Sequence, residues 1–432
     1  MEMRSRLTGM PNARPTVLAL VVVCVAAGST AWSPTAAQPG REPALTKAQW
    51  REDLREFARE LPKRHKNVYH ATSREQFERA VADLDAAIPS LQDHQIIVKL
   101  QQIAATVGDG HTGVRIPPSF RIYPLALYWF GRELRVIAAG PAYPAALGAR
   151  LVGIGGVAID EVLARVRTCF PSAENENEWY VLATSPAFIV RPEVLQALGI
   201  VSRLESAAFT LLDDQGREST IEIQPVAVPP ADGVATLGLT PAAKQPPIYR
   251  QRPTDSLWFT DLPGTTTTYV NFRRYASLGD RARELFAHVD RQRPDRFVID
   301  LRQNGGGDFF EGRKHLIAPL KQRPALNQKG HLFVIVGRQT FSAAMVNAID
   351  FKKETNAIIV GEPIGERPNS YSENDALTLH HSRLVVSYST RYYKFLDEDV
   401  PAFVPDVRID PNWPDFVAGR DPVLDWILSQ IQ

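Results

Sequence analysis

Three short segments of the chain hold residue types that together could hydrolyse an acyl bond. The first reads Gly-Asp-Gly-His-Thr at residues 108–112, and the second reads Asp-Leu-Arg-Gln-Asn-Gly-Gly-Gly at residues 300–307. The third, Thr-Phe-Ser-Ala-Ala at residues 340–344, contains Ser342. A serine hydroxyl is a weak nucleophile until a base takes its proton, and histidine suits that role because its ordinary pKa is about 6.5. We therefore interpret Ser342 as a candidate nucleophile and His111 as a candidate general base.

The glycines and the turn before Ser342 could bind a developing negative charge. The apolar residues 297–299 predict a buried strand, and the glycines beyond it leave backbone N–H groups open to an oxygen. A second apolar run at 332–336 precedes the serine, and residues 343–354 predict a helix. Ser342 would then lie at a strand-to-helix turn, where a helix N-terminus favours negative charge. The expected oxyanion donors are the backbone N–H groups of Gly306 or Gly307 and of Ala343.

At these motifs the chain resembles the C-terminal processing, or tail-specific, serine peptidase family. The resemblance is to the branch with the tricorn protease core and the interphotoreceptor retinoid-binding modules, and it spans most of the mature chain. It implies an α/β fold with a crotonase-like ββα catalytic core, an N-terminal helical domain and a PDZ-like module. In one branch of the family the base is a lysine, but this chain has Arg367 at that position. Because arginine is not deprotonated in proteins, a Ser–Lys dyad is excluded and His111 is the expected base.

An acid that orients the imidazole is expected near the C-terminal end. The resemblance places it a few residues before the pair Pro405-Asp406, where the chain reads Asp397-Glu398-Asp399. Asp399 and Glu398 are both candidates for the acid that holds the tautomer of the base. The alternative is that this acidic run is a solvated loop and that neither residue has the role.

Apolar periodicity divides the chain into three expected domains. Residues 44–115 show helical spacing and predict a helical domain. Residues 120–226 predict short strands, including a hairpin at 208–212 and 219–223, and resemble a PDZ-like module with an insertion between 167 and 206. This module could bind a peptide end by strand addition, or it could be structural. Residues 245–432 alternate between strand-like and helical patterns and predict the α/β catalytic core.

The N-terminus and the composition indicate an exported protein. Arginines followed by a short apolar run and small residues predict a signal peptide over residues 1–37, with an uncleaved membrane anchor as the alternative. We expect a periplasmic or secreted protein with no stable membrane insertion after cleavage. The formal net charge of +1, with both signs interspersed, argues against nucleic-acid binding.

No metal or cofactor is expected. The histidine pairs lack the helical spacing or the acidic partner of a zinc site; they are His65 with His70 and His380 with His381. The sequence therefore predicts a serine-type peptidase that acts on peptide or protein substrates. The alternatives are a non-catalytic binding or scaffold protein on the same fold and an esterase-like acyl hydrolase, since the same constellation cleaves esters.

Overall fold

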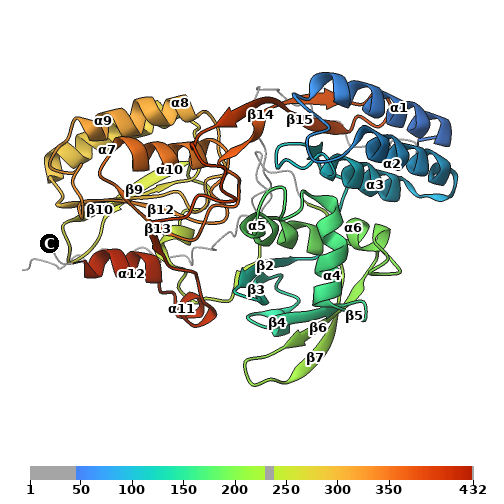
Figure 1. Cartoon of the computed structure of the whole chain (residues 1–432). Coiled ribbons are helices and arrows are strands. Elements are labelled where there is room, and N and C mark those ends of the chain that lie inside the picture. The colour runs from blue at the N-terminus through green and yellow to red at the C-terminus, as the bar shows by residue number, and fades with distance from the viewer. Residues whose placement is uncertain (1–44, 229–237, 431–432) are drawn as a thin grey trace, which may run out of the picture.

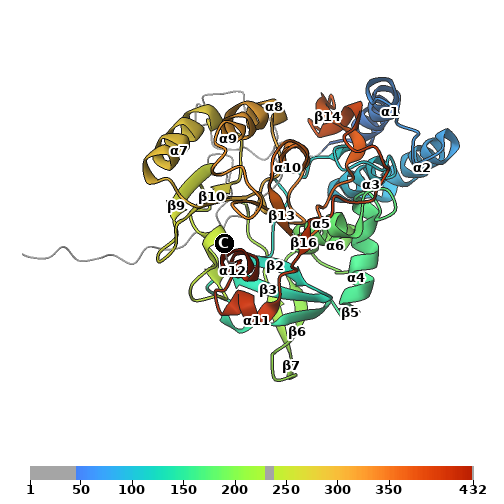
Figure 2. The ribbon, with the colours of Figure 1, turned by 60° about the vertical axis from the view of Figure 1, so that its left-hand side comes forward.

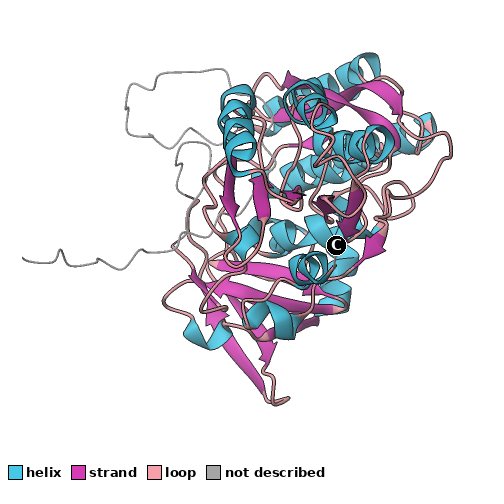
Figure 3. Ribbon diagram, turned by 90° about the vertical axis from the view of Figure 1, so that its left-hand side faces the viewer, coloured by secondary structure: helices cyan, strands magenta, loops and turns pink. Residues whose placement is uncertain are grey.

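The computed structural model describes residues 45–228 and 238–430 (Figure 1). The expected signal peptide lies outside the described residues. Within them, no helix is both long enough and apolar enough to cross a membrane. The molecule contains helices and several sheets and is of the mixed α/β class (Figure 3).

The N-terminal part is helical, as the periodicity predicts. Capping boxes start the first two helices, because Thr46 and Ser73 each accept the backbone N–H three residues further on. Trp50, Phe57 and Phe77 are fully buried between the helices. The elements are α1 (Lys47–Arg64), α2 (Arg74–Ala87), the 3₁₀ helix η1 (Ile88–Ser90) and α3 (Asp93–Ala105).

A long hairpin from the C-terminal part completes this helical part. Its strands are β14 (Asn369–Thr378) and β15 (Val385–Lys394), and β15 also pairs with β1 (Gly113–Val114). Leu377 and Val386 share the hydrophobic cluster of the helices. Figures 1 and 2 both show the hairpin leaving the core to lie beside α1. This hairpin was not expected from the sequence, because most of its residues are polar.

The middle part is an antiparallel sheet covered by helices. The predicted hairpin at 208–212 and 219–223 is confirmed as β6 and β7. The strands are β2 (Leu125–Phe130), β3 (Glu133–Ala139), β4 (Arg150–Ile154), β5 (Val157–Ala158), β6 (Ala207–Leu212), β7 (Glu218–Ile223) and β8 (Thr240–Pro241). The helices are η2 (Pro144–Ala146), α4 (Ile159–Val166), η3 (Arg167–Cys169), α5 (Glu178–Ile189) and α6 (Pro192–Ala197). The expected insertion is thus mostly helical, and it leads into the site described below.

The C-terminal part is a six-stranded sheet with helices on both faces. Its order is β16-β13-β12-β11-β10-β9, and all neighbours are parallel except the β10–β9 pair. The strands are β9 (Leu257–Asp261), β10 (Thr267–Phe272), β11 (Arg296–Asp300), β12 (Leu332–Val336), β13 (Ile358–Gly361) and β16 (Val407–Arg408). The central strands β11 and β12 are buried along their whole length, as expected where helices cover both faces.

The two faces of this sheet have separate hydrophobic clusters. Val334 of β12 packs with Leu285 and Met345 from the helices above the sheet in Figure 1. Phe333, the preceding residue, packs with Leu424 of the helix below it. The helices are η4 (Ile248–Arg250), α7 (Leu278–Gln292), α8 (Phe309–Gly312), the π-helical η5 (Arg313–Ile317), α9 (Ala318–Lys321), α10 (Ala343–Glu354), α11 (Trp413–Val417) and α12 (Pro422–Ser429).

The carboxyl ends of three parallel strands bring the glycine and serine motifs together. The glycine run follows β11, Ser342 follows β12, and Glu366 follows β13. Loops after neighbouring parallel strands meet at one edge of a sheet, which is where ligands bind in open α/β sheets. Arg302 stiffens this edge, because its guanidinium bridges Asp300 at the end of β11 and Asp421 at the start of α12, with 2.6 Å ion pairs to both.

Candidate active site

Ser342 and His111 lie within hydrogen-bond distance of each other. The Oγ atom of Ser342 is 3.1 Å from Nε2 of His111, although the two residues come from different parts of the chain. His111 stands in the loop between α3 and β1, and its ring stacks on Phe341 with 4.8 Å between ring centroids. A neutral imidazole at this distance can take the hydroxyl proton.

Ser342 has a strained backbone at the start of α10. Its φ of 54° and ψ of −125° are uncommon for a residue other than glycine. Two contacts hold this conformation: Phe341 donates its N–H to the carbonyl oxygen of Asn304, and Ser342 donates its N–H to Oε2 of Glu366. Strain of this kind is retained where surrounding structure over-determines it, as at active sites.

The glycine loop lies against Ser342, but its N–H groups are not equally available. An alanine Cβ at position 306 would lie 2.7 Å from Cβ of Ser342, so only glycine fits there. The Gly306 N–H already donates to Oδ1 of Asn304 at 3.0 Å. Within residues 45–228 and 238–430, the N–H groups of Gly307 and Ala343 have no hydrogen-bond acceptor. Of the three expected donors, these two are therefore free for an oxyanion.

The acid beside His111 is Glu366. Its Oε1 atom lies 3.8 Å from Nδ1 of His111, and neither atom has a hydrogen-bond partner among the described residues. Its other carboxylate oxygen accepts the N–H of Ser342. Glu366 therefore touches both members of the Ser–His pair, and its side chain is 1% exposed.

The structure places neither Asp399 nor Glu398 at His111. Both side chains are exposed in the loop that follows β15, and no hydrogen bond or ion pair among the described residues joins either to the imidazole. The main-chain carbonyl of Glu398 instead accepts the side-chain amide of Asn369 at 3.0 Å. Among the described residues, the acid that lies beside His111 is thus Glu366 and not a residue of the acidic run. The sequence signal for Glu366 was its position directly before Arg367. Arg367 occupies the position of the lysine base in one branch of the family.

The middle part supplies a second buried carboxyl group, which the sequence analysis missed. Glu176, in the insertion before α5, accepts the N–H of Gly110 at 2.6 Å and the N–H of Arg367 at 3.1 Å. It thereby joins the histidine loop to the segment that carries Glu366. The nearest sequence signal was only the unexpected length of the insertion.

Burial controls the ionisation of the site. Burial lowers the pKa of His111 below 6.5, and the Asp109 carboxylate and the backbone of Tyr371 oppose this shift. Burial also raises the pKa of Glu176 to about 7, against the two N–H groups that it accepts. The pKa of Glu366 is raised well above 4.5, first by burial and then by the neighbouring Glu176. A histidine that is neutral at pH 7 can act as a base.

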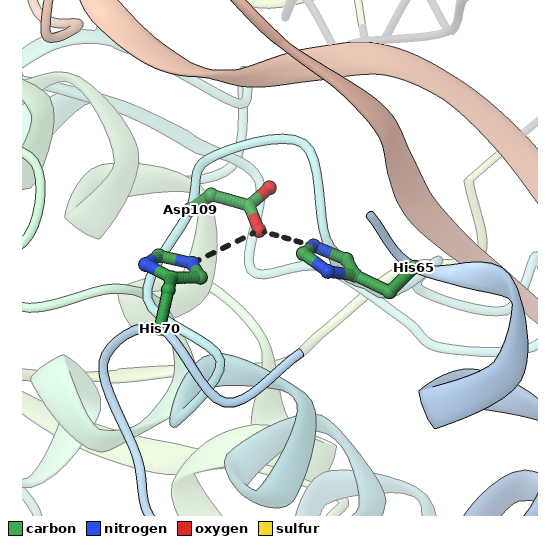
Figure 4. Close-up of side chains that lie close together, drawn as sticks. All are labelled: His65, His70 and Asp109. Carbon is green, nitrogen blue, oxygen red and sulfur yellow. Dashed lines mark hydrogen bonds and ion pairs between the residues drawn. The ribbon is translucent and has the colours of Figure 1, made fainter. Parts of the chain in front are cut away.

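Asp109 holds the histidine loop in place. Its Oδ1 atom accepts the backbone N–H of His111 at 3.1 Å and the hydroxyl of Ser389 at 2.7 Å. Its Oδ2 atom lies 2.9 Å from Nε2 of His65 and 3.8 Å from Nε2 of His70 (Figure 4). The pKa of Asp109 is lowered, because these partners outweigh the burial that would raise it. The expectation that the His65 and His70 pair lacks an acidic partner is therefore wrong.

The same three side chains have the composition of a metal site, but the hydrogen bonds of His65 do not fit one. Nδ1 of His65 accepts the backbone N–H of Asn67 at 2.9 Å, so the ring proton of the neutral imidazole is on Nε2. A metal at Nε2 would need the lone pair of that atom and would move the proton to Nδ1, where it would face the Asn67 N–H. The arrangement is that of a hydrogen-bonded support for the histidine loop.

Comparisons with known proteins agree with this fold. Residues 266–408 match the model of peptidase family S41, a range that contains Ser342 and Glu366. A comparison with curated proteins finds no match.

Solved structures with a similar fold include two of mature CPAF. One is complexed with lactacystin; it is 11% identical, with a TM-score of 0.56 over 88% of this chain and 97% of that chain. The other is 10% identical, with a TM-score of 0.56 over 88% and 96% of the two chains. The photosystem II D1 C-terminal processing protease is 16% identical over 87% of this chain and 98% of that chain, with a TM-score of 0.39. At these identities the likeness to CPAF shows the fold alone.

The α/β core and the family match place the chain among the serine peptidases, which are hydrolases. The match over residues 266–408 shows that this part of the chain is similar to peptidase family S41, the tail-specific peptidases.

Proposed function

We propose that the protein is an exported serine peptidase that cleaves peptide bonds through an acyl-enzyme. The observation that carries the proposal is the 3.1 Å approach of Ser342 Oγ to His111 Nε2. His111 takes the hydroxyl proton while Oγ bonds to the substrate carbonyl carbon, and the imidazolium then gives that proton to the leaving amine. Water repeats the sequence on the ester: His111 takes a proton from water and returns it to Oγ when the C–Oγ bond breaks.

Two further groups complete this mechanism. The N–H groups of Gly307 and Ala343 would donate to the carbonyl oxygen as it becomes negative; such donors are typically worth 10²–10³ in turnover each. Glu366 would keep the proton of neutral His111 on Nδ1, which leaves the Nε2 lone pair free to accept the serine proton. It would also stabilise the imidazolium, since a positive charge beside a buried carboxyl group favours ionisation of that group.

Active-site labelling tests the proposal directly. A fluorophosphonate probe reacts only with an activated serine hydroxyl, and we expect it to modify Ser342 in the folded protein. Ser342→Ala and His111→Ala should each abolish labelling and peptide cleavage, and the double variant should lose little more, because nucleophile and base act as a unit. A labelled protein that cleaves esters but no peptide would instead identify an acyl hydrolase. An unlabelled, inactive protein would identify a binding or scaffold protein.

The exported location rests on the N-terminal sequence. Cleavage after Ala31 or Ala37 would release a chain that starts shortly before α1. N-terminal sequencing of protein recovered from the periplasm or the medium should find one of these new ends. A full-length chain in the membrane fraction would contradict export and favour the membrane anchor.

For the middle part, residues 120–226, we propose a PDZ-like module with a structural role. Its insertion carries Glu176, whose carboxylate joins Gly110 to Arg367. Titration calorimetry with the inactive Ser342→Ala protein should therefore detect no binding of short peptides to this module. Binding that survives blocking of the active site would show that the module reads peptide ends.

A further inference from the structure

A second hydroxyl group lies at the catalytic nitrogen of His111. Oγ of Ser372, on β14, is 3.3 Å from Nε2, the atom that also faces Ser342 Oγ at 3.1 Å. Among the described residues these are the two hydroxyl groups within hydrogen-bond distance of Nε2. Ser372 comes from the hairpin that the sequence analysis did not anticipate, and it is half-buried.

The strand that carries Ser372 is distorted directly beyond it. Cα pairing with β15 includes Ser372 opposite Arg391 and Asn374 opposite Ser389, but it omits Glu373 between them. Glu373 has a φ of 58°, in the left-handed region. Tyr393 and Arg391 both contact its carboxylate, and these contacts hold the residue in that conformation. Backbone strain of this kind is retained where local geometry serves a purpose, here beside the base.

The two hydroxyl groups differ in one respect during the proposed reaction. In the acyl-enzyme, Oγ of Ser342 is esterified and has no proton to donate to Nε2. Ser372 keeps its hydroxyl, whose oxygen can accept the Nε2 N–H of the imidazolium that forms when Nε2 takes the water proton. It is therefore able to hold the Nε2 side of the ring at the stage when water must be activated.

We propose that Ser372 is a positioning residue for deacylation, which holds the imidazole of His111 while Ser342 is esterified. The inference rests on the proposed acyl-enzyme function. In this step water oxygen bonds to the ester carbonyl carbon, Nε2 takes one water proton, and the proton passes to Ser342 Oγ as the ester bond breaks. Ser372 neither gains nor loses a proton overall. Its removal should therefore slow deacylation more than acylation.

Stopped-flow kinetics with 4-nitrophenyl acetate separate the two steps. The burst of nitrophenolate reports acylation, and the steady rate after it reports deacylation. We expect Ser372→Ala to keep the burst rate within about twofold and to lower the steady rate about tenfold, as suits one hydrogen bond to a group that becomes charged. Ser372→Thr, which keeps the hydroxyl, should restore the steady rate.

Ser370→Ala is the matched control. Ser370 lies two residues earlier on the same strand, and its hydroxyl makes no hydrogen bond among the described residues; both rates should stay unchanged. If Ser372→Ala does not fold, as judged by its Tm, Ser372→Cys keeps the size of the side chain and weakens the hydrogen bond. Equal changes in both rates, or none, would overturn the inference. A wild-type protein with no burst and no acetylated Ser342 by mass spectrometry would overturn the proposed function itself.

Discussion

Glu366 Oε1 and His111 Nδ1 face each other across 3.8 Å, and neither atom has another hydrogen-bond partner in the part of the chain that the structure describes. A small closure of this gap would make the hydrogen bond that sets the tautomer of a catalytic histidine. Contacts of this kind are often long in unliganded sites and shorten when substrate binds.

Replacing Glu366 should remove most of the activity. In Glu366→Gln the side chain keeps its shape but can no longer take up the negative charge that would stabilise the imidazolium, and loss of an orienting acid costs on the order of 10⁴ in turnover. Asp399→Asn and Glu398→Gln are the matched controls, because both residues are exposed and away from His111. Steady-state cleavage of a peptide library by the three variants decides the matter. A loss confined to Asp399→Asn or Glu398→Gln would restore the acidic run to the site.

A side chain at position 306 should disable the site. Gly306 has a φ of 105°, and an added Cβ would lie 2.7 Å from Cβ of Ser342 and 2.9 Å from the carbonyl oxygen of Phe341. Gly306→Ala should therefore lower turnover by about 10² or more, in line with disturbed oxyanion donors, and destabilise the protein by about 1–3 kcal/mol. Gly305→Ala is the control, because its Cβ would meet open space. Similar activities for the two variants would contradict the close approach.

The buried Glu176 should make stability fall as pH rises. Its pKa is raised from 4.5 to about 7, so the folded protein binds its proton more tightly than the unfolded chain does between these values. Glu176 therefore does not lower the free energy of unfolding below pH 4.5. As pH rises from 4.5 to 7 it lowers the free energy of unfolding progressively, and above pH 7 the loss reaches about 3 kcal/mol.

Urea unfolding of the wild type and Glu176→Gln between pH 5 and 8 measures this effect. The wild type should lose stability relative to the variant as pH rises. Glu176 also raises the pKa of Glu366, so its removal lowers that pKa. This second change also makes the stability of the variant fall less with pH than that of the wild type. A difference between the two proteins that does not change with pH would contradict the raised pKa.

Chelation should leave the protein unchanged. Because the proton of His65 lies on Nε2, the group of Asp109, His65 and His70 is a hydrogen-bonded support for the loop of His111. Dialysis against EDTA should alter neither turnover nor Tm, whereas Asp109→Asn should lower both, because it breaks a buried network. Loss of activity on chelation that Zn²⁺ restores would show a metal site.

Arg367 should not act as a base. Its backbone N–H is held by Glu176, a contact that survives truncation of the side chain. Arg367→Ala should retain activity within about tenfold, since a guanidinium stays protonated and transfers no proton at neutral pH. Turnover of this variant beside Ser342→Ala is the measurement. An equally deep loss in both would reopen the assignment of the base.

Local patterns predicted the elements of the core and two members of the site. The buried runs of β11 and β12 and the helix α10 follow from apolar periodicity, which depends on neighbours in the chain. Ser342 and His111 stand in short motifs of unusual composition, so their types and flanking glycines were visible in the sequence.

The tertiary structure decided which other side chains reach these two residues. Glu366 is brought to the site because β13 runs parallel to β12 and their loops share one edge of the sheet. Glu176 and Ser372 arrive from an insertion and from a polar hairpin, neither of which has a local signal for its position. The acidic run with Glu398 and Asp399 has the more suggestive composition, yet it is exposed. The residue type determines which chemistry a side chain can perform. Whether the side chain is buried at the site depends on contacts between residues far apart in the chain.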